Sequence, residues 1–143
     1  MKILFLFSII VLSLTTSAQQ KEQDITKQDG YYWHSITSPV LYGNPKLDFL
    51  SSMLERYNIL RQVENTDYLS DCRAELHKLQ EDSRRTDFGL GKIVKLMNNF
   101  YSVKANLDIL IVDAYCYCIK EIAGVSKEEL IKYKNELVDR YKN

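Results

Sequence analysis

The sequence has few of the residues that bind metal ions or nucleic acids. Its 143 residues include only two histidines and three cysteines, and neither His34 nor His77 stands at ligand spacing from the other or from a cysteine. Lysine and arginine together number 19, as do aspartate and glutamate, so the formal net charge is zero. Because nucleic-acid binding depends on clustered positive charge, we expect neither a metal site nor a nucleic-acid partner.

Motifs for nucleotide binding and for hydrolysis are incomplete or missing. Gly91 and Lys92 suggest a phosphate-binding loop, but that motif also needs a glycine five positions before Gly91 and a serine or threonine after Lys92. Thr86 and Ile93 occupy those two positions. No serine lies in the Gly-x-Ser-x-Gly pattern of many hydrolases. We therefore expect no cofactor, and a binding role is favoured over an enzymatic one.

The N-terminus has the pattern of a secretory signal peptide. Lys2 precedes an apolar run from Ile3 to Leu14, and small residues follow up to Ala18. The run is about twelve residues long, whereas a membrane-spanning helix needs roughly 20, and no cysteine follows to carry a lipid. We expect residues 1–18 to be a signal peptide, with no stable membrane anchor after cleavage. The mature protein is then periplasmic or secreted.

Two further segments precede the first predicted helix. Residues 19–29 are mostly Gln, Lys, Glu and Asp, which predicts a solvated, flexible arm. Residues 30–44 are rich in aromatic side chains and are interrupted by Pro39 and Gly43, so we expect them to be irregular. A single helical domain is expected over residues 30–143, a length at which one apolar core is usual.

The first two predicted helices cover residues 45–63 and 66–82. Asn44 is a suitable N-cap and Pro45 a preset first position for the earlier helix, in which leucines and a tyrosine recur at helical spacing. Thr66 and Asp67 begin the later one, which carries a single apolar stripe among charged positions. The polar stretch after residue 82 and the glycines at 89 and 91 then predict a turn.

The last two predicted helices cover residues 92–123 and 126–141. The 92–123 stretch keeps apolar steps of three and four without proline or glycine, so one long helix is the simplest interpretation. A buried strand over 109–119 is the alternative, but it breaks the phase of that pattern. Because 109–119 is apolar nearly all round, we expect it at the centre of the fold. Ser126 and Glu129 form a capping box that starts the final helix.

Together these patterns predict an all-α fold. Four helices with short connections favour a four-helix antiparallel bundle, because each apolar stripe must find a facing one. The bundle carries an irregular aromatic-rich N-terminal segment.

The three cysteines predict one disulfide and one unpaired thiol. Cys72 and Cys118 lie on the apolar stripes of their predicted helices, whereas Cys116 faces another way, about 200° round the helix. We therefore favour Cys72–Cys118, with Cys72–Cys116 as the alternative, because sequence does not fix the connectivity. A redox role is not favoured, because Cys-Tyr-Cys lacks the spacing of thiol-activating motifs.

The aromatic segment is the candidate binding site. Tyrosine and tryptophan are enriched at the centres of protein interfaces, which favours recognition of a protein partner, for example by a periplasmic inhibitor or immunity-type protein. The alternative is that the segment folds back and covers one end of the bundle. The candidate binding residues are Tyr31, Tyr32, Trp33, His34 and Tyr42.

Two other functions stay open. A carrier of a lipid or other apolar ligand would need a cavity beside the 92–123 helix. A small hydrolase acting on cell-wall material would use Asp71, Glu75 and His77, and requires that they converge in one pocket. Asp71 and Glu75 belong to a row of acidic residues on the predicted 66–82 helix, which is more simply interpreted as a solvated helix face. The sequence does not indicate the oligomeric state.

Overall fold

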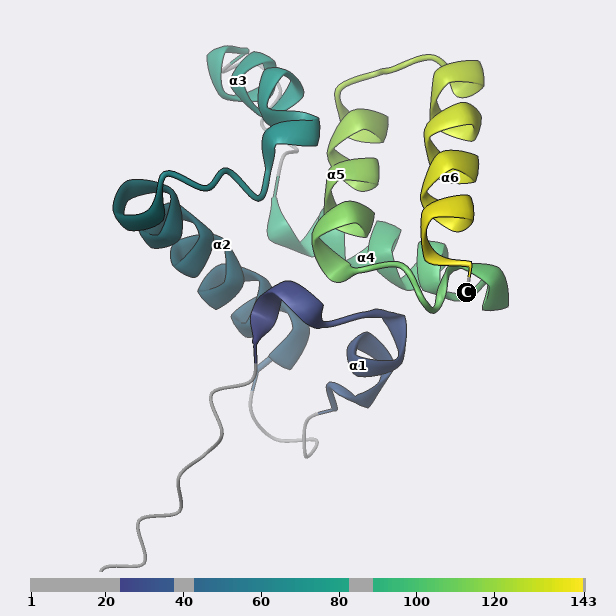
Figure 1. The fold of residues 1–143 in the computed structure, drawn as a ribbon, viewed down its shortest axis with the longest axis horizontal. Helices are drawn as coiled ribbons and strands as arrows, with labels where there is room; N and C mark the ends of the chain where they lie inside the picture. Colours follow the sequence, from purple (N-terminus) through teal and green to yellow (C-terminus); the bar gives the residue numbers. More distant parts are fainter. Residues whose placement is uncertain (1–23, 38–42, 83–88, 143) are drawn as a thin grey trace, which may run out of the picture.

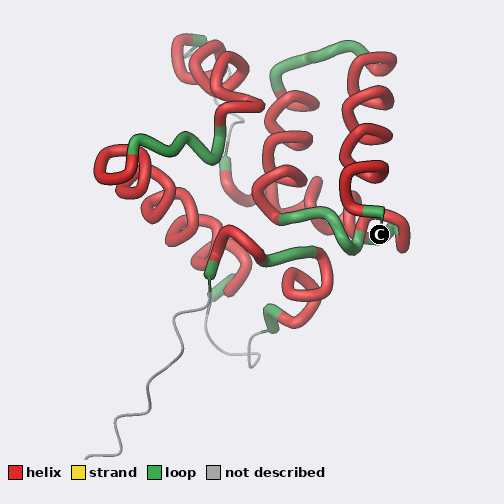
Figure 2. Tube along the Cα trace, in the orientation of Figure 1, coloured by secondary structure: helices red, strands yellow, loops and turns green. Residues whose placement is uncertain are grey.

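The protein is helical throughout the part of the chain that the structure describes. The computed structural model describes residues 24–37, 43–82 and 89–142, and within these ranges it contains helices, 3-10 turns and no strand beyond one isolated bridge between Asp29 and Leu110 (Figure 2). The all-α prediction is confirmed. The helices are α1 (Gly30–Ser35), α2 (Pro45–Glu64), α3 (Arg73–Glu81), α4 (Leu90–Tyr101), α5 (Ile111–Ile122) and α6 (Lys127–Tyr141), and the 3-10 turns are η1 (Ile25–Lys27), η2 (Ser70–Cys72) and η3 (Lys104–Asn106).

Helix α5 is the centre of the fold. Most of its residues are buried, and it contacts α3, α4 and α6 as well as the η1 and η2 turns (Figure 1). The expected central position of residues 109–119 is confirmed. Helices α5 and α6 run antiparallel, but α4 crosses α5, and α2 packs on α4. Six helices in this arrangement do not confirm the predicted four-helix antiparallel bundle.

The predicted long helix over residues 92–123 is wrong, because the chain turns between α4 and α5. The turn is held by polar groups rather than by proline or glycine. The side-chain amide of buried Asn106 donates to the Phe100 carbonyl at the end of α4 (2.6 Å), and the Tyr101 hydroxyl donates to the Ile109 carbonyl (3.0 Å). The first bond satisfies a carbonyl at the end of α4, and the second ties the connection before α5 to α4, so the interruption is stable.

The N-terminal segment supplies the other partners of this turn. The Gly30 amide donates to the Leu107 carbonyl (2.9 Å), and the Ile111 amide donates to the Gln28 carbonyl (2.8 Å). A Cβ atom on Gly30 would lie 2.9 Å from the Leu107 Cα, so the approach of the two segments requires glycine. Residues 24–29, predicted as part of a solvated arm, therefore pack on the core, and residues 30–35, predicted as irregular, form α1.

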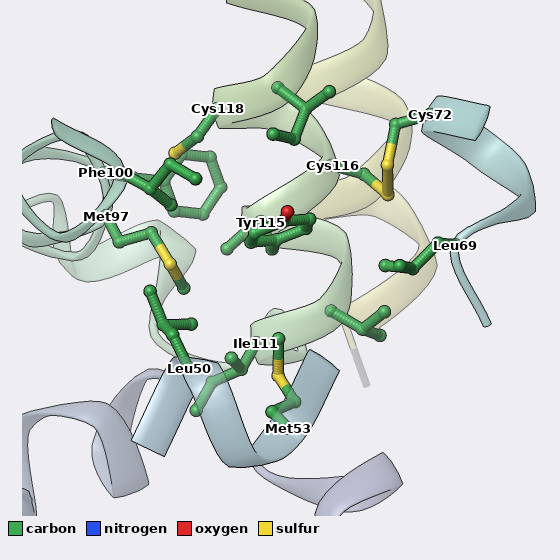
Figure 3. Close-up of a cluster of buried hydrophobic side chains, with 14 of the residues drawn as sticks. Leu50, Met53, Leu69, Cys72, Met97, Phe100, Ile111, Tyr115, Cys116 and Cys118 are labelled. Carbon is green, nitrogen blue, oxygen red and sulfur yellow. A yellow bond between two sulfur atoms is a disulfide. The ribbon is translucent and has the colours of Figure 1, made fainter. Parts of the chain in front are cut away.

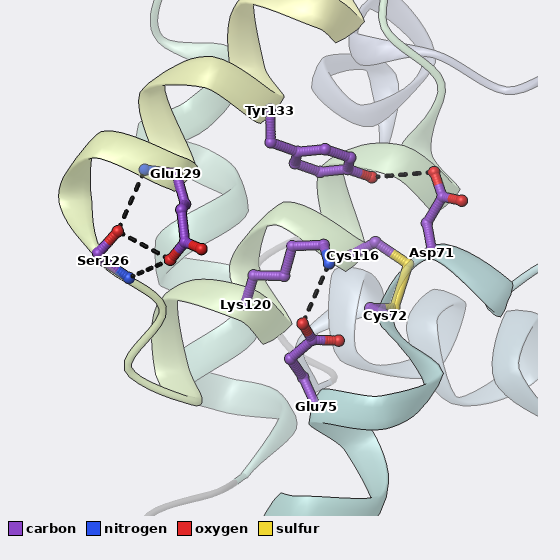
Figure 4. Close-up of polar contacts among 8 residues, drawn as sticks. All are labelled: Asp71, Cys72, Glu75, Cys116, Lys120, Ser126, Glu129 and Tyr133. Carbon is purple, nitrogen blue, oxygen red and sulfur yellow. Dashed lines mark hydrogen bonds and ion pairs between the residues drawn. A yellow bond between two sulfur atoms is a disulfide. The ribbon is translucent and has the colours of Figure 1, made fainter.

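Two helix starts follow the sequence signals. The Asn44 side chain accepts from the Lys46 amide ahead of α2, and Ser126 and Glu129 form the reciprocal capping box of α6 (Figure 4). The helix predicted over residues 66–82 starts later than expected. Here Asp67 accepts from the Leu69 amide in a turn, and the regular α-helix begins only at Arg73.

The predicted disulfide between Cys72 and Cys118 is also wrong. Cys72 pairs with Cys116, with Cα atoms 5.1 Å apart, and Cys118 is a free, buried thiol whose pKa is raised by burial (Figure 3). The prediction assumed one continuous helical periodicity over residues 92–123, whereas a turn separates α4 from α5 and changes which side chains share a face. In the observed helix α5, Cys116 faces η2, and Cys118 points to the side on which Phe100 lies.

The predicted leader lies outside the described residues. The same holds for residues 19–23 of the predicted arm and for Tyr42, one of the candidate binding residues.

Candidate functional site

Trp33, the central residue of the predicted binding segment, belongs to the core. Its exposed fraction is 0%, its indole Nε1 donates to the Asn98 side-chain oxygen (2.9 Å), and its ring meets Phe49 edge-on. The Lys46 ammonium lies 4.8 Å above the ring centroid and also donates to Asn98. Burial lowers the pKa of Lys46. The ring therefore fixes α1 to α2 and α4. This agrees with the alternative interpretation, in which the aromatic segment folds back on the helices.

The neighbours of Trp33 differ in exposure. Tyr31 is 55% exposed, and the half-buried Tyr32 ring lies 5.5 Å from the ring of Phe49. His34 is exposed, and its Nε2 lies 3.0 Å from the Tyr101 carbonyl oxygen. Of the described candidate residues, Tyr31, Tyr32 and His34 are thus accessible on the surface, whereas Trp33 is not.

The three residues of the hydrolase alternative take part in separate contacts. Glu75 pairs with Lys120 of α5 (3.1 Å), and Asp71 accepts from the Tyr133 hydroxyl of α6 (3.3 Å; Figure 4). His77 is exposed on α3. Asp71 and Glu75 therefore join η2 and α3 to the α5–α6 pair, an arrangement that does not support a hydrolase.

One buried carboxylate forms a second polar cluster. Asp113 of α5 accepts from the Tyr141 hydroxyl (2.6 Å) and lies 3.7 Å from the Arg140 guanidinium. Burial raises the pKa of Asp113 above its ordinary value, although the Tyr141 hydrogen bond and Arg140 oppose the shift. The cluster attaches the end of α6 to the central helix, which is a structural task.

A hollow lies between η1 and α2, which are side by side in Figure 1. It has a volume of about 590 Å³, within the range of known ligand sites. The η1 side and α1 contribute Ile25, Gln28 and Tyr32. The facing side of α2 and the turn after it contribute aromatic, apolar and charged residues, among them Phe49, Ser52, Met53, Arg56, Leu60, Glu64 and Tyr68. We call this hollow the η1–α2 cleft.

Local bonds keep the two sides of the cleft in place. The Tyr57 hydroxyl of α2 donates to the Ile25 carbonyl of η1 (3.2 Å), and burial raises the pKa of Tyr57. The Tyr57 ring also stacks on Tyr68, with centroids 5.1 Å apart. Among the lining residues, the Thr26 hydroxyl donates to Asp24 and lowers the pKa of that carboxyl. The cleft is therefore a built feature of the fold.

Gln28, one of the residues that line this cleft, carries a buried and unpaired acceptor. The residue is only 7% exposed, it lines the cleft, and its side-chain Oε1 is the one buried side-chain polar atom without a partner among the described residues. A buried oxygen left in this state costs about 1–3 kcal/mol. Such an atom requires an explanation, and binding of a ligand is one. No periodicity or motif in the polar stretch 19–29 distinguishes Gln28, so sequence reasoning missed it.

A second, smaller pocket lies between α2, α3, α4 and α5. Its volume is about 270 Å³, and its apolar lining includes Leu54, Leu76 and Ile93. Arg73 stands at this pocket with its guanidinium on the Asp67 carboxylate, an ion pair that lowers the pKa of Asp67 through its hydrogen bonds. A carrier of a lipid or other apolar ligand requires a pocket of this kind beside the region predicted as the 92–123 helix.

No protein-family model, no curated protein and no solved structure matches this chain. Within residues 24–37, 43–82 and 89–142, no helix combines the length and the apolar character needed to cross a bilayer. The same residues contain no group of three or more His, Cys, Asp or Glu side chains able to hold a metal ion. Function must therefore be inferred from the cleft and its surroundings.

Proposed function

We propose that the chain is a small exported binding protein that recognises another protein through the face formed by η1, α1 and α2. The η1–α2 cleft is the observation that carries the proposal. It joins a sizeable hollow to aromatic side chains, the combination that anchors protein interfaces. Export rests on the predicted leader, and a periplasmic inhibitor or immunity-type protein is one concrete form of this function.

The outer surface of α2 extends the cleft. Arg56 and Leu60 line it, and Ile59 and Val63 stand one helical turn from them, so the four side chains share one face of the helix. Val63 is 77% exposed, and Ile59 is also exposed. An apolar edge beside a hollow is typical of a surface that another protein covers.

The proposal is tested by affinity capture with two matched variants. Val63→Glu places a charge on the edge of the cleft, and Ile131→Glu places the same charge at a site on α6 that is 58% exposed. We expect the unmodified chain and Ile131→Glu to retain one stoichiometric protein, and Val63→Glu to lose it. Circular dichroism checks that both variants stay folded. Capture that is unchanged by Val63→Glu contradicts the proposal.

An apolar-ligand carrier is the second candidate, and the pocket between α2, α3, α4 and α5 favours it. A carrier should bind a fluorescent fatty-acid probe there in a saturable way. Leu76→Trp fills the pocket and should abolish binding, whereas Ile131→Trp should leave it unchanged. Equal binding by the two variants contradicts the carrier.

A further inference from the structure

We propose that the η1–α2 cleft receives an indole ring, the side chain of a tryptophan on the partner protein, whose N–H donates to Gln28. This inference rests on the proposed function and specifies the anchor that the partner supplies. Three features of the cleft carry it: an unpaired acceptor, aromatic walls and a cation.

The acceptor restricts the chemistry of the occupant. A glutamine Oε1 accepts hydrogen bonds and cannot donate them, so the occupant must bring an N–H or O–H group. Gln28 Oε1 is buried in the structure, and the proposed bond requires the amide to rotate toward the cleft, which the broad energy profile of the terminal glutamine torsion permits. A neutral donor such as an indole N–H satisfies the oxygen without bringing a charge into a partly apolar site.

The walls suit a flat aromatic ring. Tyr32 and Phe49 form an aromatic pair at one part of the lining, and Tyr68 adds another ring. Met53 and Leu60 contribute apolar surface between them. Aromatic pairs contribute about 0.5–1.5 kcal/mol beyond the burial of their surface, and a tryptophan ring gains most from such walls.

The protein already binds one indole by the same means. Around Trp33, the Asn98 amide oxygen accepts from the indole N–H, Lys46 lies over the ring and Phe49 meets its edge. In the cleft, Gln28 offers an amide oxygen, Arg56 supplies a cation, and Phe49 is again among the walls. Because cations prefer the face of tryptophan over other rings, the same three components favour an indole.

The test compares two probes that differ only in the donor. N-acetyl-tryptophanamide carries the indole N–H, and its 1-methyl analogue keeps the ring but lacks this hydrogen. Binding is measured by following the amide resonances of the protein, including the Gln28 side chain, by nuclear magnetic resonance. We expect about tenfold tighter binding of the unmethylated probe, the ratio that corresponds to one hydrogen bond to a buried acceptor.

Two glutamine variants identify the residue responsible. Gln28→Leu should bind both probes equally, whereas Gln62→Leu, on an exposed part of α2 outside the cleft, should keep the tenfold preference. Equal binding of the two probes by the unmodified protein overturns the inference, as does the absence of saturable shifts at the cleft. If the probes fail but Val63→Glu still loses its partner, the protein-binding function stands without the indole. If Val63→Glu retains the partner, the function itself fails.

Discussion

Reduction of the Cys72–Cys116 disulfide removes a cross-link that closes a long stretch of chain. The two cysteines are separated by 44 residues and join the η2 turn to the central helix α5. The unfolded reduced chain explores conformations that the cross-linked chain cannot reach. For a loop of this length, the loss of chain entropy corresponds to about 4 kcal/mol at room temperature. We therefore expect reduction to lower the free energy of unfolding by about this amount.

Urea unfolding under oxidising and reducing conditions measures the effect. Cys118→Ala leaves the bridge intact, so this variant should lose the same free energy on reduction as the unmodified protein. Cys116→Ala has no bridge, so its unfolding curve should be identical under both conditions. Peptide mapping of the unreduced protein identifies the pairing directly.

The reasoning fails on either of two results. One is a peptide map that links Cys72 to Cys118, with Cys116→Ala still sensitive to reduction. The other is that reduction lowers the free energy of unfolding of the unmodified protein by less than about 1 kcal/mol. This loss is far below the value expected from chain entropy and would mean that the unfolded chain is already compact near these residues.

Three further changes probe the packing and the cleft. Gly30→Ala should lower the free energy of unfolding by about 1–3 kcal/mol, because the added Cβ meets the Leu107 backbone. In the control variant Gly91→Ala the added Cβ meets no atom, so the unfolding midpoint should stay unchanged or rise. Gln28→Leu should raise the free energy of unfolding by about 1 kcal/mol in thermal melts, because it removes an unpaired buried acceptor; a loss would mean that this oxygen has a partner. Burial raises the pKa of Asp113 above 3.8, so the stability that its protonated form contributes is complete below pH 3.8 and is lost as the pH rises through the folded-state pKa. Asp113→Asn should therefore reduce the fall of the free energy of unfolding with pH, measured by urea titrations at a series of pH values. The same pH dependence in the variant and the unmodified protein would refute the assignment.

The helices that the sequence predicts well are those with local signals at their ends. Asn44 and Pro45 mark the start of α2, and Ser126 and Glu129 mark the start of α6, because a cap needs only residues within one turn of each other. The apolar density of residues 109–119 likewise predicts the central helix. These features depend on neighbours in sequence, so they can be read without knowing the tertiary structure.

The turn between α4 and α5 depends on residues far away in the chain. Asn106 closes the end of α4, but the backbone groups of Leu107 and Ile111 are satisfied by Gly30 and Gln28, about 80 residues earlier. No local pattern encodes such a contact, and the apolar spacing continues through the turn. The wrong disulfide follows from the same error, because the phase of α5 cannot be taken from α4.

The aromatic segment shows a different limit of sequence reasoning. Tyrosine and tryptophan suit both an interface and a core, and only the partners of the ring distinguish the two. Trp33 finds Asn98 and Lys46 and is buried, whereas Tyr31 finds no such pocket and stays on the surface. The candidate site therefore moves from Trp33 to the cleft beside it.

Gln28 links the fold to the proposed site. Its carbonyl accepts from the Ile111 amide at the start of the central helix, so the backbone position of this residue is fixed by the core. Its side-chain oxygen remains buried and unpaired beside the cleft. Leucine would fill a similar volume without the cost of an unsatisfied acceptor, so the fold gains nothing from glutamine at this position. A residue that costs stability at a rigid place beside a hollow is consistent with a group that enters the hollow, and the indole N–H that we propose for the partner would compensate that cost.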